Sequence, residues 1–360
     1  SIPQTGNIGV GDRIIIGGTA TTTLYISGKV DTSHWKVVTN TGATPADIST
    51  PTPVSHIYRT FASLSAAVGG ETPGAPALLG TANLTSPPPG YILNIPLYYD
   101  SGPDSNRVII RTLGGWTTGP NNYIRIYTPT NTSTEVNQSQ RHSGVWNDTK
   151  YNMRSSSSTP NIISILIPYV RIEGLQISGD SSNFIEINYS NAGYTYISNS
   201  ILKGNKTTPQ KGILSAVTTS ASLYSWNNII YGIDTTTSTS RVFESQNGTS
   251  YIYSSTFIGG WYGILRSSGT VTVKNVYSGG VGNVAYQGTI SKTTAASSDA
   301  SGSTGLQNIE VSTTTFTNVT DGTEDFHLPS GSALLDVGTD THNDPAPLNF
   351  STDIDNEARV

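Results

Sequence analysis

Cysteine is absent from this sequence of 360 residues, and charged residues are scarce. A chain without cysteine forms neither disulfide bonds nor metal sites with thiolate ligands. Asp, Glu, Lys and Arg account for 12% of the residues, against about 25% in an average soluble domain. The net charge is −5 and no basic cluster occurs. The sequence therefore lacks the positive charge that neutralises phosphates, and we expect no nucleic-acid partner.

Long apolar runs are also absent. The longest, residues 161–170, is interrupted by Pro168 and is about half as long as the roughly 18–20 residues of a membrane span. We therefore expect no transmembrane segment. The chain begins at Ser1, without a methionine or a signal peptide, which favours a processed and exported protein. The expected location is extracellular, at a cell surface or in a virion.

Glycine (37 residues) and tyrosine (19 residues), with serine, threonine and asparagine, replace the charged residues. This composition is typical of strands and tight turns. In the second half of the chain, a strand-turn unit ends in glycine about every 25 residues, with an apolar or aromatic residue two places earlier; the units span 172–179, 197–204, 225–232, 252–259 and 272–279. One such unit cannot bury its own apolar face, so the repeat predicts stacked units. Because no helical segment separates the strands, we expect an all-β fold, a right-handed parallel β-helix (solenoid).

The chain divides into four segments. Residues 1–50 predict a small N-terminal β appendage, with strands over 12–16, 22–26 and 35–38. Residues 51–90 predict a linker and a short capping helix. Three prolines indicate that 43–56 are a linker. The predicted helix spans 61–68, with an N-cap at Thr60 and a stop at Gly69 and Gly70. Such a helix would cover the unpaired strand edges at the end of the solenoid. Residues 91–328 predict the β-helix, and 329–360 predict a C-terminal cap or tail.

Within the β-helix, second strands are expected between the repeats, at 184–187, 212–215, 242–243 and 263–266. Residues 130–160 are polar and predict a long loop that projects from the solenoid. Residues 290–305 are rich in Ser, Thr, Ala and Gly and predict a flexible excursion. A last rung is expected at 310–318.

Five segments carry a resemblance to known proteins. Residues 170–178, together with the Asp-Phe-His-Leu element of 325–339 and the Asp-Ile-Asp turn of 353–359, resemble right-handed parallel β-helix repeat proteins of the pectate-lyase-like superfamily, although Asn356 stands where glycine is usual. Residues 114–130 and 139–151 are similar to uncharacterised members from environmental bacteria and phages. The resemblance covers about residues 58–358. It implies the fold but no particular activity, because the superfamily includes lyases, hydrolases, tailspikes, adhesins and structural proteins.

Catalytic carboxylates are not evident. The resemblance implies clustered aspartates and a basic residue for a lyase, and an inverting hydrolase would need paired aspartates on adjacent rungs. Asp180 and Asp234 occur at turns, where aspartate is an ordinary residue. At repeat positions charged residues occur singly, as Glu173, Glu186, Lys203, Glu244, Arg266 and Lys274. We therefore predict no catalytic residue and no cofactor.

Histidines give two weaker patterns. His142 lies near Arg141 and Asp148 in the expected loop, a grouping that carries little information because serine is so frequent. His327 and His342 lie near acidic residues of the C-terminal segment, namely Asp325, Asp340 and Asp344. A surface ion site is one interpretation, but scattered His and Asp more often bind nothing, and we predict no metal.

Aromatic residues are the candidate binding groups. Outward-facing rings would form a sugar-stacking platform, for which the candidates are Trp146, Trp226, Trp261 and Tyr262, with Tyr224 nearby. The alternative, which we favour, is that these rings fill the core or stack along the solenoid. Aligned Asn199, Asn227 and Asn275 likewise favour asparagine stacking at turns. Possible glycosylation sites are the nine sequons at Asn83, Asn131, Asn137, Asn147, Asn188, Asn205, Asn247, Asn318 and Asn349.

The favoured function is a non-enzymatic extracellular structural or assembly protein, such as a filament, surface fibre or virion component. In this hypothesis the protein self-associates into a homo-oligomer or filament, and residues 1–50 pair with the sheet edge of a neighbour. The alternative is a polysaccharide-binding or polysaccharide-degrading β-helix protein, such as a tailspike-like depolymerase or lyase. A glycan-binding adhesin would require an exposed aromatic strip on one face of the solenoid.

Overall fold

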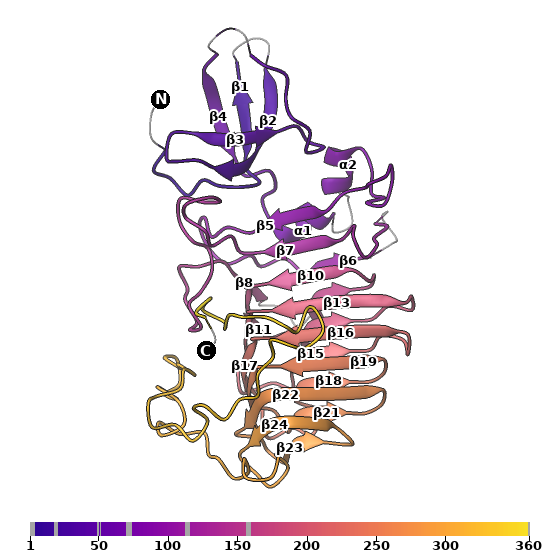
Figure 1. The fold of residues 1–360 in the computed structure, drawn as a ribbon, viewed down its shortest axis with the longest axis vertical. Coiled ribbons are helices and arrows are strands. Elements are labelled where there is room, and N and C mark those ends of the chain that lie inside the picture. Colours follow the sequence, from indigo (N-terminus) through magenta and orange to yellow (C-terminus); the bar gives the residue numbers. More distant parts are fainter. Residues whose placement is uncertain are drawn as a thin grey trace.

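The computed structural model describes residues 4–17, 21–48, 50, 52–69, 74–111, 116–155 and 160–358. Ser1, Gly70, Arg359 and the start of segment 114–130, which the sequence singled out, lie outside these residues. Parallel strands stack in a tall column, and a small antiparallel sheet lies over its N-terminal end (Figure 1). The predicted all-β parallel β-helix, with its N-terminal appendage and capping helix, is confirmed.

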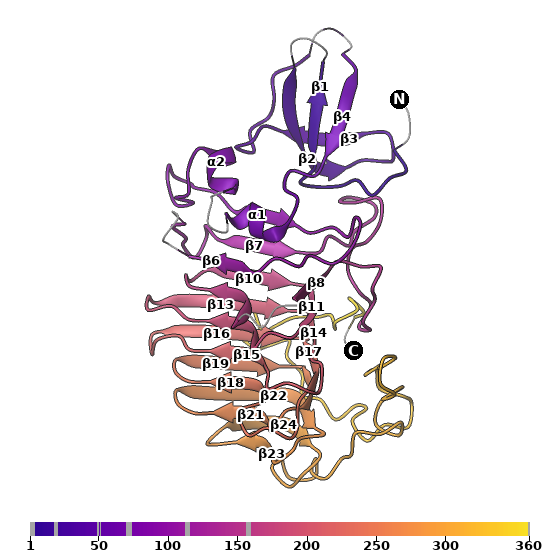
Figure 2. The same ribbon diagram turned by 180° about the vertical axis from the view of Figure 1, so that it is seen from behind.

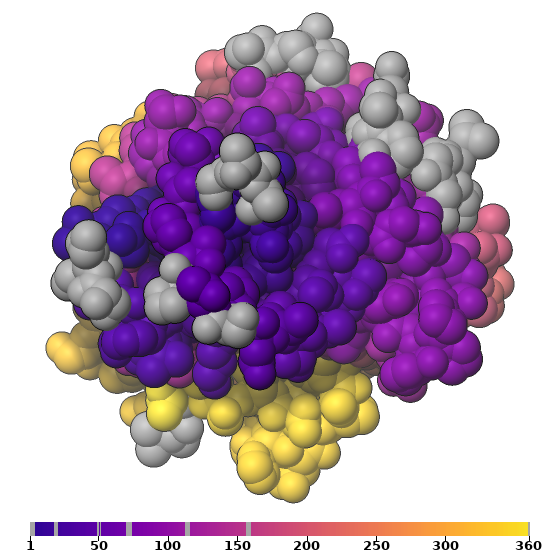
Figure 3. Space-filling model, turned by 90° about the horizontal axis from the view of Figure 1, so that it is seen from above, coloured from indigo at the N-terminus to yellow at the C-terminus, as the bar shows by residue number. Residues whose placement is uncertain are grey.

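The N-terminal sheet has the strand order β3-β2-β1-β4 within the described residues. Its strands are β1 (Arg13–Ile16), β2 (Thr22–Lys29), β3 (Trp35–Val38) and β4 (Val54–Tyr58). The first three were predicted. The fourth was not, because residues 43–56 indicated a linker; the strand begins directly after Pro53, and Ile57 pairs with Ile14 of β1. Seen from above, this sheet covers the end of the solenoid, and the C-terminal residues extend beside it (Figure 3).

Two short helices lie between the sheet and the solenoid (Figure 2), namely α1 (Leu64–Val68) and α2 (Ala75–Leu79). Helix α1 begins three residues later than predicted. Ser63, not Thr60, is its N-cap, because the Ser63 side chain accepts a hydrogen bond from the amide of Ala66. The helix packs its buried side chains into the core of the solenoid and ends at Gly69 with φ 84°. Helix α2 was not predicted.

The solenoid has three faces, and from residue 124 to residue 287 each turn of the chain adds one strand to each face. Face A consists of β5 (Leu93–Pro96), β7 (Ile124–Tyr127), β10 (Val170–Glu173), β13 (Gly193–Ser198), β16 (Ala221–Trp226), β19 (Thr249–Tyr253) and the first half of β22 (Thr270–Gly279). Face B consists of β8 (Asn152–Ser155), β11 (Gln176–Gly179), β14 (Ile201–Lys203), β17 (Ile229–Ile233), β20 (Thr256–Gly259) and the second half of β22. Because β22 belongs to both faces, A and B form one sheet. With β24 (Ser291–Ser297), which pairs along β22, this sheet has 13 strands in the described chain.

Face C is a separate sheet of seven strands in the described chain. Its strands are β6 (Val108–Ile110), β9 (Asn161–Ile165), β12 (Asn183–Ile187), β15 (Lys211–Ser215), β18 (Arg241–Ser245), β21 (Tyr262–Arg266) and β23 (Val284–Gln287). The second strands expected between the repeats are confirmed as β12, β15, β18 and β21.

Alternation along each strand separates the core from the surface. In β16, Leu223 and Ser225 are buried while Tyr224 and Trp226 are partly exposed, as the period of two requires. Four residues two places before the repeat glycines are fully buried, namely Ile177, Leu202, Ile230 and Phe257. Each such side chain contributes about 1.5–3 kcal/mol by leaving water, so the glycine-terminated pattern marks the core.

The bend from face A to face B is made by residues in the left-handed conformation. Gly174, Asn199, Asn227, Ser254 and Asn275 have φ between 46° and 76°, a region in which glycine and asparagine cost least. Asn227 Nδ2 donates to Asn199 Oδ1 over 3.1 Å, which confirms the predicted stacking for this pair. Asn275 instead exchanges two hydrogen bonds of 2.7 Å with the backbone of Thr339.

Two expectations for the last rungs are wrong. Residues 290–305, expected to be a flexible excursion, contain β24 (Ser291–Ser297), which pairs along β22. Its core residue is the small Ala295, and Ala296 packs on the opposite side of the strand, so the composition suggested a loop where a strand forms. Residues 310–318, expected to be a last rung, form turns without a named strand. From them Phe316 enters an apolar cluster on the outside of face B.

The segment 130–160 also differs from expectation, because much of it packs against the bend instead of projecting. Gln140, Arg141 and His142 are buried. The backbone amide of Val10 donates to the Glu135 carbonyl over 3.0 Å, and Gln140 Nε2 donates to Asn7 Oδ1 over 2.8 Å. The segment therefore fastens the N-terminal sheet to the solenoid.

The C-terminal segment 298–358 runs back along the outside of face B toward the N-terminal end (yellow in Figure 1). Phe316 and Phe326 pack on outward residues of face B, namely Ile201, Ile229, Tyr231 and Tyr277. Lys203 pairs with Glu324 at 3.3 Å. No helix of the described chain is both long enough and apolar enough to cross a membrane.

Candidate functional site: the outer surface of face A

Two columns of side chains point outward from face A. Strand register places Asn94, Arg125, Arg171, Tyr196, Tyr224 and Tyr251 at successive positions of the first column. The second column contains Tyr127, Glu173, Ser198, Trp226, Tyr253 and Lys274. Residues far apart in sequence thus form one continuous surface parallel to the solenoid axis.

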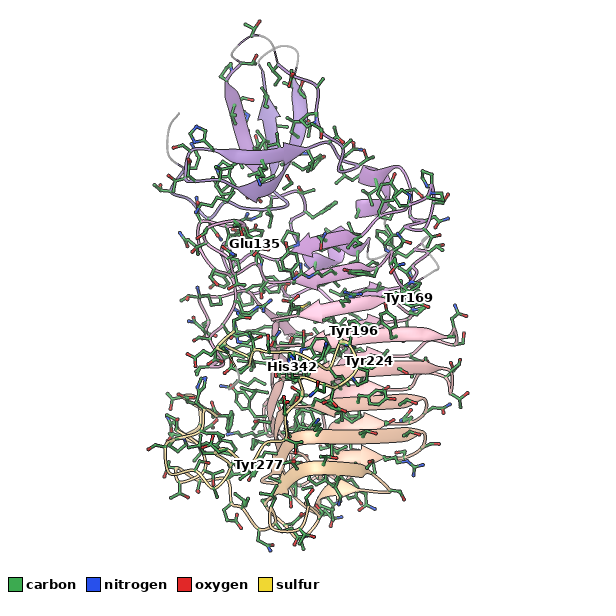
Figure 4. All side chains as sticks on the ribbon, in the orientation of Figure 1. Glu135, Tyr169, Tyr196, Tyr224, Tyr277 and His342 are labelled. Atoms are coloured by element: carbon green, nitrogen blue, oxygen red, sulfur yellow. The ribbon has the colours of Figure 1, made fainter. Side chains whose placement is uncertain are left out.

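The lower part of the first column is an aromatic ladder. Tyr196 and Tyr224 meet edge to face at 5.4 Å, and Tyr224 stacks on Tyr251 at 5.0 Å with the rings 14° apart. Tyr194, two residues before Tyr196 on β13, stacks on Tyr196 at 4.6 Å and meets Tyr169 edge to face at 4.9 Å. Figure 4 shows Tyr169, which immediately precedes β10, with Tyr196 of β13 and Tyr224 of β16 on this face. These contacts hold the rings in place while leaving them partly exposed.

Arg171 lies at the top of the ladder, between two rings. Its guanidinium carbon is 3.5 Å from the ring centroid of Tyr123 and 4.9 Å from that of Tyr196. Both distances fall in the range of cation–π attraction. The rings therefore fix the position of a positive charge that is partly buried.

Glu173 forms the ionic centre of the second column. Arg125 donates to Glu173 Oε2 at 2.6 Å, and Arg141 donates to Oε1 at 3.0 Å. Burial acts to raise the pKa of Glu173, but the positive charges of Arg141 and Arg125 and their hydrogen bonds outweigh it, so the pKa lies below its ordinary value. The carboxyl group is therefore ionised and fully engaged at neutral pH.

These side chains form the floor of a groove of about 460 Å³. Its upper wall includes Ile92 and Asn94, and its lower wall includes Trp226 and Pro347 of the C-terminal segment. Phe350 stacks on Trp226 at 6.2 Å with the rings 14° apart, and Lys274 Nζ donates to Asp344 Oδ2 at 2.6 Å. The C-terminal segment therefore bounds the groove and covers part of the second column.

A second hollow of about 590 Å³ lies between the N-terminal sheet and the first rung. Phe61, Leu79 and Leu93 contribute to its apolar side. Ile92 and Asn94 line both hollows, so the groove on face A adjoins the space beneath the N-terminal sheet.

No family model, curated protein or solved structure matches this chain. The groove must therefore be interpreted from its own chemistry.

The four aromatic residues predicted as a platform do not lie on one surface. Trp226 lies in the groove. Trp146 packs against the C-terminal cluster on face B and donates to Asp148 at 2.6 Å. Tyr262 belongs to face C, where the guanidinium carbon of Arg241 lies 4.7 Å from its ring centroid, and Trp261 immediately precedes it. Of these four, Trp226 alone lies on face A, in the second column, where its ring meets that of Tyr196 of the ladder edge to face at 5.8 Å.

Sequence reasoning missed Arg171, Tyr196 and Tyr123. Tyr196 alternates with the buried Thr195 and Ile197, and Arg171 alternates with Val170 and Ile172. This period of two is the signal that would have identified outward residues on face A.

The histidines contact different partners from those expected. His142 Nε2 donates to the Asn199 carbonyl at 2.9 Å, and its Nδ1 accepts from the Gly144 amide at 3.2 Å. Asp148 is elsewhere, paired with Arg154. His327 lies between Asp325 and Asp355, with Nε2 2.7 Å from Asp355 Oδ2. The exposed His342 has no part in this contact.

One acidic cluster of the described chain has the composition of a cation site. Carboxylate oxygens of Asp353, Asp355 and Glu357 lie within 4.8 Å of one another. Asp353 Oδ1 accepts hydrogen bonds from the amides of Asp355 and Glu357 at 3.0 and 2.9 Å. These hydrogen bonds form a turn, and the turn explains why the three carboxylates lie close together.

The sequon asparagines differ in exposure. Asn131, Asn188 and Asn349 are exposed, and the other six are partly buried. The Nδ2 atom of Asn137 donates to the Gln4 carbonyl, and that of Asn205 donates to Asp180 at 2.8 Å. A glycan on either nitrogen would replace these hydrogen bonds.

Proposed function

We propose that this protein binds polysaccharide chains on the outer surface of face A. The observation that carries the proposal is the register-aligned ladder of Tyr196, Tyr224 and Tyr251 below Arg171. Aromatic rings offer apolar faces and edges to the C–H groups of a sugar, and tyrosine hydroxyls add hydrogen bonds. A strip of this kind suits an extended ligand with repeating units.

The rigid strands that carry the ladder favour binding. The rings stand on parallel strands whose inward residues, such as Ile197 and Leu223, are fully buried. A surface that is already ordered loses little conformational entropy when a ligand binds. The solenoid therefore acts as a rigid scaffold for the strip.

The charge arrangement favours binding over cleavage. Glu173 is the one carboxylate among the described residues that line the groove, whereas hydrolysis by an acid–base pair needs two carboxyl groups. Its contacts with Arg125 and Arg141 occupy both oxygens. We thus propose a non-enzymatic, extracellular protein. The stacking of the parallel strands in register also supports our proposal that the protein belongs to the pectate-lyase-like superfamily.

Binding should be tested with a panel of soluble polysaccharides by affinity electrophoresis, followed by calorimetry on the best ligand. Replacing both Tyr196 and Tyr224 by alanine should weaken binding about tenfold or more, because two aromatic contacts of about 1 kcal/mol each are lost. Tyr262→Ala, a tyrosine change on face C, is the matched control. The proposal fails if the folded wild-type protein binds none of the panel, or if the double variant binds equally well.

A second proposed function is self-association into a homo-oligomer or filament. In the described sheet β3 and β4 are edge strands, and on β4 Val54 and Tyr58 are 53% and 44% exposed. Unpaired edges with apolar side chains accept strands from neighbours. Electron microscopy of the wild type should show assemblies that the double variant Val54→Lys, Tyr58→Lys does not form. Val30→Lys, an exposed position outside β4, is the control; isolated wild-type rods would exclude this function.

A further inference from the structure

The groove on face A has an unbalanced positive charge. Arg125 and Arg141 share one carboxylate, that of Glu173. Arg171 forms no ion pair within the described chain, and its Nε is buried without a hydrogen-bond acceptor there. Among the described residues that line the groove, two arginines, Arg125 and Arg171, thus stand against one carboxylate, Glu173, in a protein whose net charge is −5.

The position of Arg171 makes this imbalance costly unless a ligand compensates it. Partial burial removes water from a guanidinium, and a desolvated charge is unfavourable without a partner. The rings of Tyr123 and Tyr196 stabilise the cation through their faces, but they accept few of its hydrogen bonds. The buried Nε cannot be reached by a ligand, whereas the terminal Nη1 and Nη2 groups of Arg171 are not among the buried, unpaired atoms and are available to an incoming anion.

We propose that the polysaccharide recognised on face A is anionic, and that Arg171 binds the carboxylate or sulfate of one sugar unit. A guanidinium offers two parallel N–H groups, which match the two oxygens of either anion. Tyr196 and the ladder below it contact the adjoining sugar units, and Asn94 lies one position beyond Arg125 in the same column. This inference rests on the proposed function and adds the charge class of the ligand.

The experiment compares anionic polysaccharides with neutral derivatives of the same backbone. Uronic-acid chains are paired with their methyl esters, and sulfated chains with their desulfated forms. Dissociation constants are measured by calorimetry for the wild type, Arg171→Gln and Arg171→Lys. Arg241→Gln is the control, because Arg241 also lies over a tyrosine, but on face C.

The anionic member of at least one pair should bind the wild type at least about tenfold more tightly than its neutral derivative, the usual effect of a charge-assisted hydrogen bond. Arg171→Gln should abolish this preference. Arg171→Lys keeps the positive charge but loses the planar guanidinium, so it should retain part of the preference for the anionic chain. This variant also shows whether the site tolerates substitution. Arg241→Gln should bind as the wild type does.

The outcomes separate the two proposals. Preference for a uronic-acid chain identifies a carboxylate, preference for a sulfated chain identifies a sulfate, and either supports the inference. If neutral and anionic chains bind equally, and Arg171→Gln changes neither, the inference is overturned while polysaccharide binding stands. If no chain binds the folded wild type, polysaccharide binding itself fails, and the inference fails with it.

Discussion

The side chain of Asn227 donates a hydrogen bond of 3.1 Å to that of Asn199, its equivalent one rung earlier. Both residues have positive φ, 53° and 50° respectively. Asn227 Nδ2 also donates to the Thr352 carbonyl at 2.9 Å. One side chain therefore links two rungs and the C-terminal segment at the bend between faces A and B.

Asn227→Ala should lower the free energy of unfolding by about 1–3 kcal/mol. The change leaves the side chain of Asn199 without this donor and places alanine in the left-handed region, which costs about 1 kcal/mol more. Asn227→Gly should be less harmful, because it loses the hydrogen bonds but not the conformational fit. Thermal and urea unfolding measure both, with the exposed Asn191→Ala as control. Equal stability of Asn227→Ala and the wild type would show that the link contributes nothing.

Arg59 should be the main electrostatic attachment of the N-terminal sheet. It pairs with Asp12 beside β1 at 2.6 Å and with Asp100 of the solenoid at 2.8 Å, and its guanidinium carbon lies 3.6 Å from the ring centroid of Tyr98. Arg59→Ala leaves the buried Asp12 unpaired, which should cost about 3–5 kcal/mol. Adding Asp12→Asn should recover part of that loss by removing the uncompensated charge.

Hydrogen exchange in β1 to β4 measures this attachment locally. Arg59→Ala should speed exchange in those strands more than in β13 or β16, and the exposed Lys36→Ala should not. Unchanged protection of the N-terminal sheet in Arg59→Ala would show that its backbone contacts with residues 134 and 135 suffice.

His142 should make the protein sensitive to mild acid. Burial lowers its pKa from 6.5 to about 3, and the charge of Arg141 acts in the same direction. The unfolded chain takes up a proton on this residue below about pH 6.5, whereas the folded chain does not until about pH 3. Stability is therefore lost progressively as the pH falls through this window.

Melting temperatures at pH 7 and pH 5 test this assignment. His142→Gln keeps a donor and an acceptor but does not titrate, so its melting temperature should fall less than that of the wild type between the two pH values. The exposed His56→Gln should behave as the wild type does. The same pH dependence in all three proteins would show that His142 is not the sensitive group.

The regular part of the fold was predictable because burial repeats with the rungs. Ile177, Leu202 and Ile230 occupy the same inward position before each glycine, and one glycine-terminated unit predicts the next. β4 and β24 were missed for the opposite reason. β4 has five residues and is mostly exposed, and β24 consists of polar and small residues. The strand conformation of each is decided by the neighbouring strand, β1 or β22. Pairing between distant segments leaves little trace in local composition.

The candidate site was predicted only in part, through Trp226 and Tyr224. Arg125, Arg171 and Tyr196 lie side by side, yet loops of different length separate them in sequence, so their register cannot be counted from one chain. Trp146 and Tyr262 looked equivalent to Trp226 in composition. Trp146 lies outside the strands and packs against the cluster on face B, whereas Tyr262 begins β21 of face C.

Alkaline pH should weaken the attachment of the C-terminal segment, because His327 then loses its proton. Its hydrogen bond to Asp355, with that to Asp325, raises its pKa from 6.5 to about 9, although burial opposes this. A raised histidine pKa means that the stabilisation is fully present below about pH 6.5 and is lost as the pH rises to about 9. Because the ring is partly exposed, the effect should be modest. The wild type should melt above His327→Gln at pH 6, and the difference should vanish by about pH 10, with the exposed His342→Gln as control. A difference that persists at high pH would mean that His327 acts through packing and not through its charge.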